Sequence, residues 1–379
     1  MKPFTYYNPV RMHFGEGMLD KLAGIMEDYE SPVLIVTGRS SLKKTGTLAR
    51  IETMLNNKSR EYFILNGVKS NPEIDKVRDG IEMVRQSSIK FILAAGGGSV
   101  IDTAKAIAAG FSYDGDVWDF YRGAAEPRDG LPIGVILTIA ATGSEMNPIS
   151  VITNPDEKEK VGISSPFMYP QFTIEDPELT LTVNREYTGY SGVDIIAHAV
   201  EGYFTSTDSN TPIQDGFTGV IVKTVIDNTR ILMKNPDNIE ARSNIMWAST
   251  LALNGILTAG IGRYRFENHM IGHGLSAYYN TPHGASLSIV IPAWLAVNID
   301  VYRKKIEELG SMIFGLDNAE ETVRKFKETF ASFDSPVSLE DAGITDIDEG
   351  VISSIISTAS RRNIDMTRDT LEDIFARMK

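Results

Sequence analysis

The chain has 379 residues, of which 42% are hydrophobic and 23% charged, and its formal net charge is −13. This composition is typical of a globular protein of about two domains and excludes disordered, collagen-like and coiled-coil chains. The chain has no cysteine, which excludes disulfides, thiolate metal sites and cysteine nucleophiles. Because the acidic charge repels phosphate backbones and no long basic run offsets it, we expect no nucleic-acid partner.

Neither a targeting segment nor a membrane span is expected. The N-terminal segment MKPFTYYNPVRMHFGEG lacks the apolar run and small-residue cleavage site of a signal peptide. The longest apolar stretches, 132–141 and 289–297, are about half the roughly 20 residues that a membrane span needs. We therefore expect a cytoplasmic protein that does not bind a membrane.

Between about residues 30 and 180, strand-like and helix-like patterns alternate along the chain. Short apolar runs predict strands at 32–37, 60–65, 90–95 and 132–138. Amphipathic patterns between them predict helices at 41–56, 72–86 and 99–110. This alternation predicts a parallel sheet with helices on both of its faces.

After about Leu181 the strand patterns fade and long amphipathic patterns replace them. They predict helices at 185–205, 212–228, 238–259, 263–278 and 284–298, with more toward the C-terminus. A proline and a change of period coincide near Pro177, which places the boundary between the two parts there. The sequence therefore divides into an α/β part at 1–180 and an all-helical part at 181–379.

Three glycines follow the third predicted strand, in KFILAAGGGSVIDTAKAIAA at 90–109. Gly96, Gly97 and Gly98 lack a Cβ, so the backbone can approach a ligand closely there. A helix that begins at Ser99 directs its free N–H groups to the same place, which suits a pyrophosphate. The spacing is not GxGxxG, so a standard Rossmann site is not indicated. The alternative is a tight turn without a ligand, in which Asp102 only stabilises the helix dipole.

The residues after the first predicted strand bear on which dinucleotide binds. A carboxylate at this point accepts the ribose hydroxyls of NAD and repels the 2′-phosphate of NADP. Here the strand leads instead to Arg39, Ser40 and Ser41, which could hold a phosphate. We therefore expect NADP(H) to be preferred over NAD(H). A polar helix cap in a solvated basic turn is the other interpretation.

Four of the five histidines lie in the helical part, close to one aspartate. Asp194 and His198 are four residues apart, as are His269 and His273, so each pair shares a helix face, while His283 follows a turn. A carboxylate and several imidazoles suit Fe(II) or Zn(II). A lone helical histidine is more often a hydrogen-bonded core residue, but four beside an aspartate favour a metal site. Five candidates exceed a four-ligand site, so one histidine should be free for proton transfer or substrate orientation.

Taken together, these motifs resemble the iron-dependent (group III, metal-containing) alcohol dehydrogenase family over nearly the whole chain. The resemblance lies in FGEG at 14–17, the glycine turn, ATGSE at 141–145 and, most distinctively, HMIGHGLSAYYNTPHG at 269–284. It implies a dehydroquinate synthase-like architecture, with an α/β dinucleotide-binding domain at 1–180 and an all-helical metal and substrate domain at 181–379. The cofactor side looks most similar to the branch of NADP(H)-using butanol dehydrogenases and aldehyde reductases.

The resemblance also implies roles for individual positions. The metal ligands would be Asp194, His198, His269 and His283, and the catalytic candidates would be His273, close to the nicotinamide, and Lys160. The cofactor-binding residues would be Gly38, Ser40, Asn71, Gly97, Gly98, Ser99, Asp102, Thr138, Thr142, Asn147, Lys160 and Leu179. One departure is Ile139, which replaces a threonine common in the family and would alter contacts near the cofactor.

The reaction implied is reversible hydride transfer between a primary alcohol or aldehyde and NADP(H), with one divalent ion, Fe(II) or Zn(II), in a homodimer. One alternative is a same-fold enzyme acting on a polyol or a phosphorylated sugar: a lactaldehyde reductase, a glycerol dehydrogenase or a dehydroquinate synthase-like lyase. That lyase would need a basic phosphate-binding cluster, and only Arg263 and Arg265 lie near the histidines in sequence. A catalytically silent metal-binding or nucleotide-binding protein is the second alternative.

Overall fold

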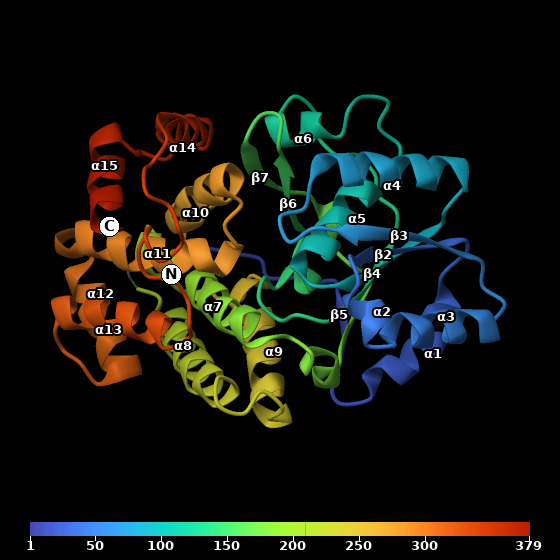
Figure 1. Cartoon of the computed structure of the whole chain (residues 1–379), viewed down its shortest axis with the longest axis horizontal. Coiled ribbons are helices and arrows are strands. Elements are labelled where there is room, and N and C mark those ends of the chain that lie inside the picture. The colour runs from blue at the N-terminus through green and yellow to red at the C-terminus, as the bar shows by residue number, and fades with distance from the viewer. Residues whose placement is uncertain (209) are drawn as a thin grey trace. The chain divides into compact units, whose positions relative to one another are not determined.

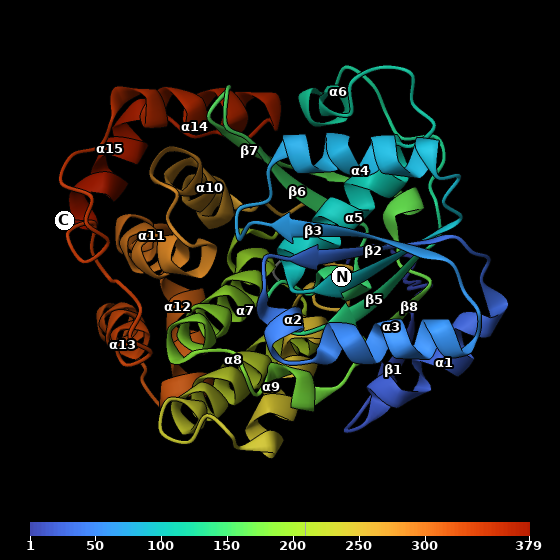
Figure 2. The same cartoon turned by 45° about the vertical axis from the view of Figure 1, so that its right-hand side comes forward.

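The α/β part is built on one six-stranded parallel sheet. The computed structural model describes residues 1–208 and 210–379. The sheet order is β1-β8-β5-β4-β2-β3, and every neighbouring pair is parallel (Figures 1 and 2). In chain order the strands are β1 (Arg11–Phe14), β2 (Val33–Gly38), β3 (Tyr62–Val68), β4 (Phe91–Gly96), β5 (Ile133–Leu137) and β8 (Phe172–Glu175). The predicted parallel sheet is confirmed.

The strands that the sequence predicted and those it missed differ in length, burial and position. β4 and β5 are buried at every residue, and β2 at all but its last, so they read as continuous apolar runs. β1 and β8 have four residues each, and β1 is a partly exposed edge strand, so neither gives a clear pattern. A separate antiparallel hairpin, β6 (Ile149–Asn154) and β7 (Glu159–Ser164), was also not predicted.

Helices separate the strands as the alternation predicts. They are α1 (Leu22–Ile25), α2 (Ser41–Lys44), α3 (Thr47–Asn57), α4 (Ile74–Gln86), α5 (Gly98–Gly110) and α6 (Trp118–Arg122). The single helix predicted at 41–56 is wrong: Gly46 has φ +76°, a left-handed conformation that interrupts the helix between α2 and α3. α5 is buried along nearly its whole length, and small side chains such as Ala104 and Ala108 let it pack against β4 and the hairpin.

The second part is helical throughout the residues that the structure describes. Its helices are α7 (Arg185–Thr205), α8 (Pro212–Leu232), α9 (Ile239–Leu253), α10 (Glu267–Tyr279), α11 (His283–Val297), α12 (Ile299–Phe314), α13 (Ala319–Ala331), α14 (Glu349–Arg361) and α15 (Arg368–Arg377). α7 has the predicted bounds, and it contacts α8, α9, α10 and α11. The helix predicted at 238–259 ends early, at Leu253, because Gly255 adopts φ +95° in the following turn.

The division of the chain differs slightly from the predicted boundary at residue 180. Contacts separate one unit at Tyr7–Val183 from a second made of Met1–Tyr6 and Asn184–Lys379. The boundary falls at Asn184 because its side chain caps α7 by accepting a hydrogen bond from the Tyr187 N–H at 2.8 Å. The first residues join the helical unit through a 2.8 Å hydrogen bond from the Lys2 N–H to the Gly260 carbonyl, a long-range contact invisible in local sequence.

Among the described residues, no single helix is both long enough and apolar enough to cross a membrane. The pair α11 and α12 meets the criteria of length and composition jointly, but it is bent by 114° at the break between them.

Candidate metal centre and glycine-rich turn

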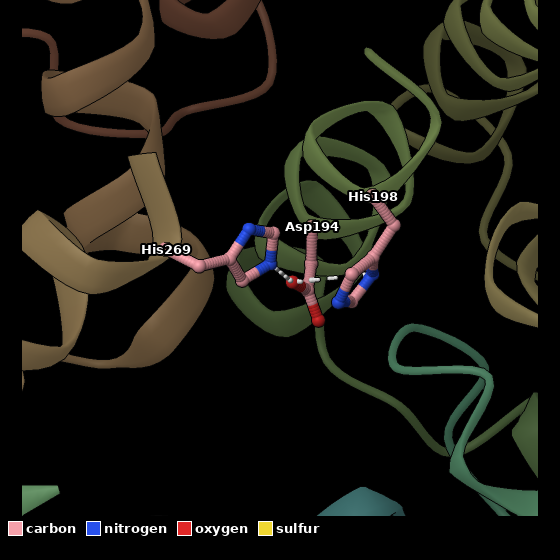
Figure 3. Close-up of side chains that lie close together, drawn as sticks. All are labelled: Asp194, His198 and His269. Atoms are coloured by element: carbon pink, nitrogen blue, oxygen red, sulfur yellow. Dashed lines mark ion pairs between the residues drawn. The ribbon is translucent and has the colours of Figure 1, made fainter. Parts of the chain in front are cut away.

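Asp194 and His198 lie one turn apart in the buried interior of α7. Both side chains are almost fully buried, and His198 Nδ1 is 3.7 Å from Asp194 Oδ1. Figure 3 shows both side chains leaving the same side of the helix. The i, i+4 spacing therefore brings this carboxylate and this imidazole together, as the sequence predicts.

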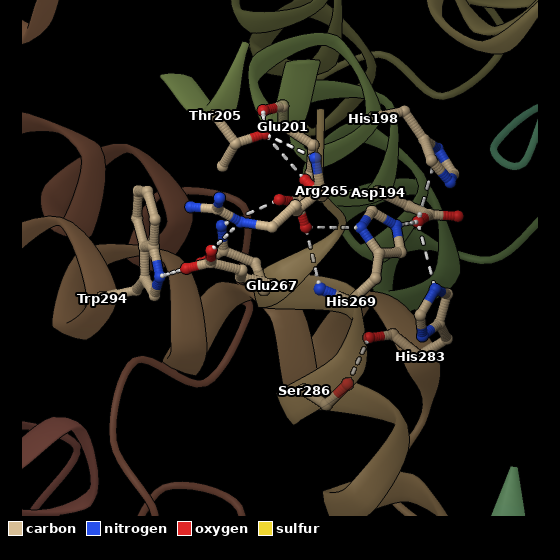
Figure 4. A network of polar contacts seen from close by, with 11 residues as sticks. Asp194, His198, Glu201, Thr205, Arg265, Glu267, His269, His283, Ser286 and Trp294 are labelled. Carbon is tan, nitrogen blue, oxygen red and sulfur yellow. Dashed lines mark hydrogen bonds and ion pairs between the residues drawn. The ribbon is translucent and has the colours of Figure 1, made fainter. Parts of the chain in front are cut away.

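Two further histidines reach the same carboxylate oxygen from other helices. His269 Nε2, from the first turn of α10, is 3.6 Å from Asp194 Oδ1. His283 Nε2, from the first residue of α11, is 3.5 Å from it (Figure 4). The three histidines thus converge on Asp194 from three helices.

Gly284 allows α11 to begin so close to α7. A Cβ at this position would lie 2.2 Å from the backbone carbonyl oxygen of Tyr190 in α7, a distance that no side chain tolerates. Only glycine permits the contact, and the contact sets His283 beside Asp194. The requirement is readable in the structure but not in the sequence, where this glycine is merely the residue after a histidine.

The four side chains fit a divalent metal ion. Two ligand atoms each about 2.1 Å from a tetrahedral ion lie about 3.4 Å apart, close to the separations of 3.5–3.7 Å here. Asp194, His198 and His269 also offer ligand atoms that all lie within 4.8 Å of one another. Among the described residues, the buried Asp194 Oδ1 and His269 Nε2 make no hydrogen bond, which is costly unless an ion occupies the space between them.

The electrostatics of the cluster favour a positive charge. Burial lowers the pKa of His269, but the hydrogen bond to Glu201 and the negative charges of Glu201 and Asp194 outweigh burial and raise this pKa to about 9. The carboxylates therefore attract a cation into a buried place, and a divalent ion satisfies that attraction while leaving the imidazoles neutral. Asp194, His198, His269 and His283 are a suitable ligand set for Fe(II) or Zn(II).

His273 lies beside this cluster without joining it. Its ring centre is 6.2 Å from that of His269, one turn away on α10, and 5.1 Å from that of His283. It is half-buried rather than buried. The role of His273 as the histidine that is not a ligand remains a prediction.

Glu201 contacts this cluster, and the sequence interpretation did not single it out. It is fully buried on α7, and its Oε1 accepts a 2.9 Å hydrogen bond from the backbone N–H of His269. The same oxygen is 3.0 Å from Nδ1 of the His269 ring. The available signal was its spacing, because positions 194, 198 and 201 share one helix face.

In the α/β unit, the glycine turn lies where the strand order of the sheet reverses direction. β2 has β3 on one side and β4 on the other, and Thr37 of β2 pairs with Ala95 of β4. The carboxyl ends of β2 and β4 are therefore neighbours, and open α/β sheets bind ligands at such switch points. Gly38 ends β2, and Gly96 ends β4, so both predicted turns meet at one edge of the sheet.

The glycine turn is packed too tightly for side chains. A Cβ at Gly98 would lie 2.4 Å from Oγ1 of Thr142. Gly97 is the extended residue before α5, so the free N–H groups of this thirteen-residue helix face the turn. The Ser99 hydroxyl donates a 2.5 Å hydrogen bond to the Ser70 carbonyl, which ties the turn to the loop that holds Asn71.

The remaining expected nucleotide residues fall into three groups. Ser40, before α2, and Thr138, whose N–H donates to the Gly96 carbonyl at 3.0 Å, lie at the carboxyl edge of the sheet. Lys160 of β7 donates a 3.0 Å hydrogen bond to Asn71 Oδ1. Leu179, in the turn after β8, packs against the hydrophobic core.

Asp102 and Asn147 belong to a buried network around Lys105. Lys105 Nζ has five acceptor oxygens within 3.2 Å, from Ser144, Asn147 and Ile149. Asp102 accepts hydrogen bonds from the Ser144 hydroxyl at 2.6 Å and from the Val151 N–H at 3.0 Å. Both oxygens of Asp102 are thus engaged within the protein, and the network holds the 144–151 segment against α5. The sequence interpretation did not single out Lys105.

Comparison with known proteins identifies the family. The model for iron-containing alcohol dehydrogenase matches residues 9–177, and the model for the C-terminal domain of the Fe-containing alcohol dehydrogenase family matches residues 188–377. The chain is 39% identical over 354 residues to a probable NADH-dependent butanol dehydrogenase 1 of Bacillus subtilis, covering 91% of each chain. It is 32% identical over 355 residues to an NADPH-dependent aldehyde reductase of Escherichia coli, covering 91% of this chain and 90% of the other.

A solved structure of similar fold supports the same family. NADH-dependent butanol dehydrogenase A of Thermotoga maritima superimposes with a TM-score of 0.95 and 34% identity, covering 100% of this chain and 99% of the other. The expected dehydroquinate synthase-like fold class is confirmed. The chain therefore belongs to the iron-containing alcohol dehydrogenase family and is an NAD(P)-dependent oxidoreductase of alcohols or aldehydes.

Proposed function

We propose that this enzyme interconverts primary alcohols and aldehydes with NADP(H), using one divalent metal ion held by Asp194, His198, His269 and His283. The observation that carries the proposal is the convergence of three imidazoles on one buried carboxylate oxygen at 3.5–3.7 Å. A purely structural role would leave the buried Asp194 Oδ1 and His269 Nε2 without a hydrogen bond, whereas a bound ion accounts for both atoms.

When bound, the ion would act as a Lewis acid toward the substrate oxygen, and the nicotinamide would supply or accept the hydride. The protein's own contribution is orientation and charge. Asp194 and the three histidines come from the rigid helices α7, α10 and α11, so the ion's place is fixed by packing rather than by loops.

In the α/β unit, the residues proposed to bind the dinucleotide pyrophosphate are Gly97, Gly98 and Ser99. The backbone N–H groups at the start of α5 would donate to phosphate oxygens, and the absence of side chains at Gly97 and Gly98 lets the phosphate approach them. Gly38, Ser40, Asn71, Thr138, Thr142, Asn147 and Leu179 would bind the remainder of the dinucleotide. Asp102 would contribute by holding the segment that contains Asn147, since its oxygens accept bonds from Ser144 and Val151.

The preference for NADP(H) is proposed from the turn after β2. Arg39, Ser40 and Ser41 supply a cation and hydroxyls for a 2′-phosphate, and the turn has no carboxylate to accept ribose hydroxyls. The names of relatives divide on this point: the butanol dehydrogenases at 38–39% identity are named NADH-dependent, and the aldehyde reductase at 32% is named NADPH-dependent. The nucleotide preference therefore needs its own measurement.

Proton transfer is assigned to His273 and Lys160. Imidazole is the side chain whose ordinary titration lies nearest neutral pH, and His273 is half-buried beside two ligand histidines. Lys160 is largely buried and directed to Asn71, which suits contact with ribose hydroxyls.

His273→Ala should lower turnover by about 10²-fold or more while metal content stays near one equivalent. Loss of the metal in this variant would mean that the ligands are wrongly assigned.

The principal test is a panel of short aldehydes and polyol-derived aldehydes, reduced with NADH and with NADPH by protein whose metal has been quantified. We expect kcat/KM to be higher with NADPH and with short apolar aldehydes, and Arg39→Ala to reduce the preference for NADPH. Higher activity with NADH would overturn the nucleotide preference but not the reaction. A lyase would cause no net NADPH oxidation, and one of the two arginines near the histidines, Arg265, is already paired with Glu267 at 2.6 Å.

We also propose a homodimer, which light scattering would show as twice the 41.7 kDa chain mass.

A further inference from the structure

Glu201 is a buried carboxylate that the proposed reaction does not use. It follows His198 by three residues on α7 and is fully buried. Positions 194, 198 and 201 lie within about 60° of one another around the helix, since each residue adds about 100°. The helix face that presents Asp194 and His198 therefore also presents a second carboxylate.

The contacts of Glu201 are made with the segment that contains another ligand histidine. Oε1 accepts a hydrogen bond from the His269 backbone N–H at 2.9 Å and lies 3.0 Å from the ring Nδ1. Oε2 accepts a 3.4 Å hydrogen bond from Asn268 Nδ2. One carboxylate thus holds both the main chain and the side chain of His269.

The main-chain contact fixes the start of α10. His269 is the third residue of that helix, and the first N–H groups of a helix have no partner within it. Glu201 satisfies one of them from α7, and its negative charge is favourable at the positive end of the helix dipole. The position of His269 along the axis of α10 is therefore tied to α7, which also supplies Asp194 and His198.

The side-chain contact decides which ring nitrogen carries the proton. An ionised carboxylate only accepts hydrogen bonds, so Nδ1 must be the protonated nitrogen when Glu201 is charged. In the neutral ring that binds a metal, Nε2 then carries the lone pair and faces Asp194 Oδ1, which is 3.6 Å away and too far for a hydrogen bond. Histidine ligands of metals generally donate their other N–H to such a partner, which orients the ring and increases its basicity.

We propose that Glu201 is a positioning residue of the metal centre: it holds His269 in the tautomer and orientation in which Nε2 faces the ion. The inference rests on the proposed metal centre. Glu201 is not one of the four ligands, yet it would contribute to the metal affinity. Replacing Glu201 should therefore weaken metal binding although all four ligands are unchanged.

The test measures metal binding rather than turnover. Co²⁺ or Zn²⁺ is returned to metal-free protein in competition with a chelator, for wild type, Glu201→Gln and Glu201→Ala. Glu201→Gln keeps an acceptor oxygen but removes the charge, so its affinity should fall by about 10-fold. Glu201→Ala should fall by up to about 100-fold. Glu267→Gln is the matched control, because this buried carboxylate bonds Trp294 and Arg265 rather than a ligand ring, and its affinity should match wild type.

The outcomes separate the inference from the metal centre itself. If wild type binds no metal, the proposed centre fails. If wild type binds about one equivalent and both Glu201 variants bind as tightly, only the role of Glu201 is overturned. Should either variant fail to fold, the zinc-loaded wild type still decides, because nitrogen-15 NMR of its five histidines reports each tautomer. A proton on Nδ1 of His269 supports the inference, and a proton on Nε2 contradicts it.

Discussion

Each unit of this enzyme contains a buried cluster of opposite charges, and the two clusters are satisfied differently. In the α/β unit, Lys105 Nζ has five acceptors within 3.2 Å, and both oxygens of Asp102 accept hydrogen bonds. In the helical unit, Asp194 Oδ1 and His269 Nε2 are buried yet make no hydrogen bond among the described residues. Both clusters are buried, but the polar atoms named here are hydrogen-bonded in the first cluster and lack hydrogen bonds in the second.

The difference separates a structural cluster from a binding one. A buried charge that lacks partners is strongly destabilising, so a protein retains it only where a ligand completes the arrangement. By this criterion the network of Lys105 serves the fold, and the cluster around Asp194 fits the proposed metal ion. Matched substitutions in the two clusters test this difference.

The largest expected effect is that of Asp194→Ala. Removing the oxygen on which three histidines converge should abolish metal binding and lower activity by about 10³-fold or more, since the Lewis acid is lost. Metal content by mass spectrometry and steady-state kinetics measure both. Asp102→Ala is the matched control: it should keep the metal and lose stability instead. Retention of the metal in Asp194→Ala would show that the centre is elsewhere.

Lys105→Met should give the opposite pattern. The carbonyl oxygens of Ser144, Asn147 and Ile149 would lose their buried donor, so the free energy of unfolding should fall by about 3–5 kcal/mol. Calorimetry or urea denaturation measures this loss, and metal content should remain near one equivalent. A variant that loses its metal but not its stability would reverse the assignment of the two clusters.

The stability of wild type should also depend on the titration of Lys105. Burial lowers the pKa of Lys105 from 10.5 to about 8, although Asp102 and Glu145 raise it. Between pH 8 and 10.5 the unfolded chain binds this proton and the folded chain does not, so this group makes stability rise with pH. Lys105→Met lacks this contribution. The gap in melting temperature between wild type and variant should therefore widen from pH 8 to pH 10, and a gap that narrows would contradict the shift.

Gly98→Ala should have the smallest effect. The added methyl would meet Oγ1 and Cγ2 of Thr142 at 2.4 and 2.5 Å, and accommodating it should cost about 1–3 kcal/mol of stability. KM for the dinucleotide should rise, while metal content is unchanged. Gly216→Ala in α8, where a Cβ meets nothing within 4 Å, is the control and should be neutral or slightly stabilising. An unchanged KM in Gly98→Ala would argue against phosphate binding at this turn.

Local patterns predicted those features whose causes are local. The buried strands β2, β4 and β5 read as apolar runs, and α7 has the bounds that its pattern predicts. The pairing of Asp194 with His198 follows from helical spacing alone. Weaker patterns came from the edge strand β1, the hairpin β6–β7 and the break at Gly46. β1 is short and partly exposed, the hairpin lies outside the main sheet, and the break depends on the conformation of one glycine.

The sequence by itself determined the chemical types available: one aspartate and three histidines spaced for helix faces, a fourth histidine after a turn, a glycine turn, and no thiolate. Only the tertiary structure decided which of these meet. Glu201 and His269 are 68 residues apart, and Lys105 and Asn147 are 42 apart, so no local pattern joins them. Such pairs form because helix packing brings buried polar atoms within reach of one another, and each buried group must then find a partner or a ligand.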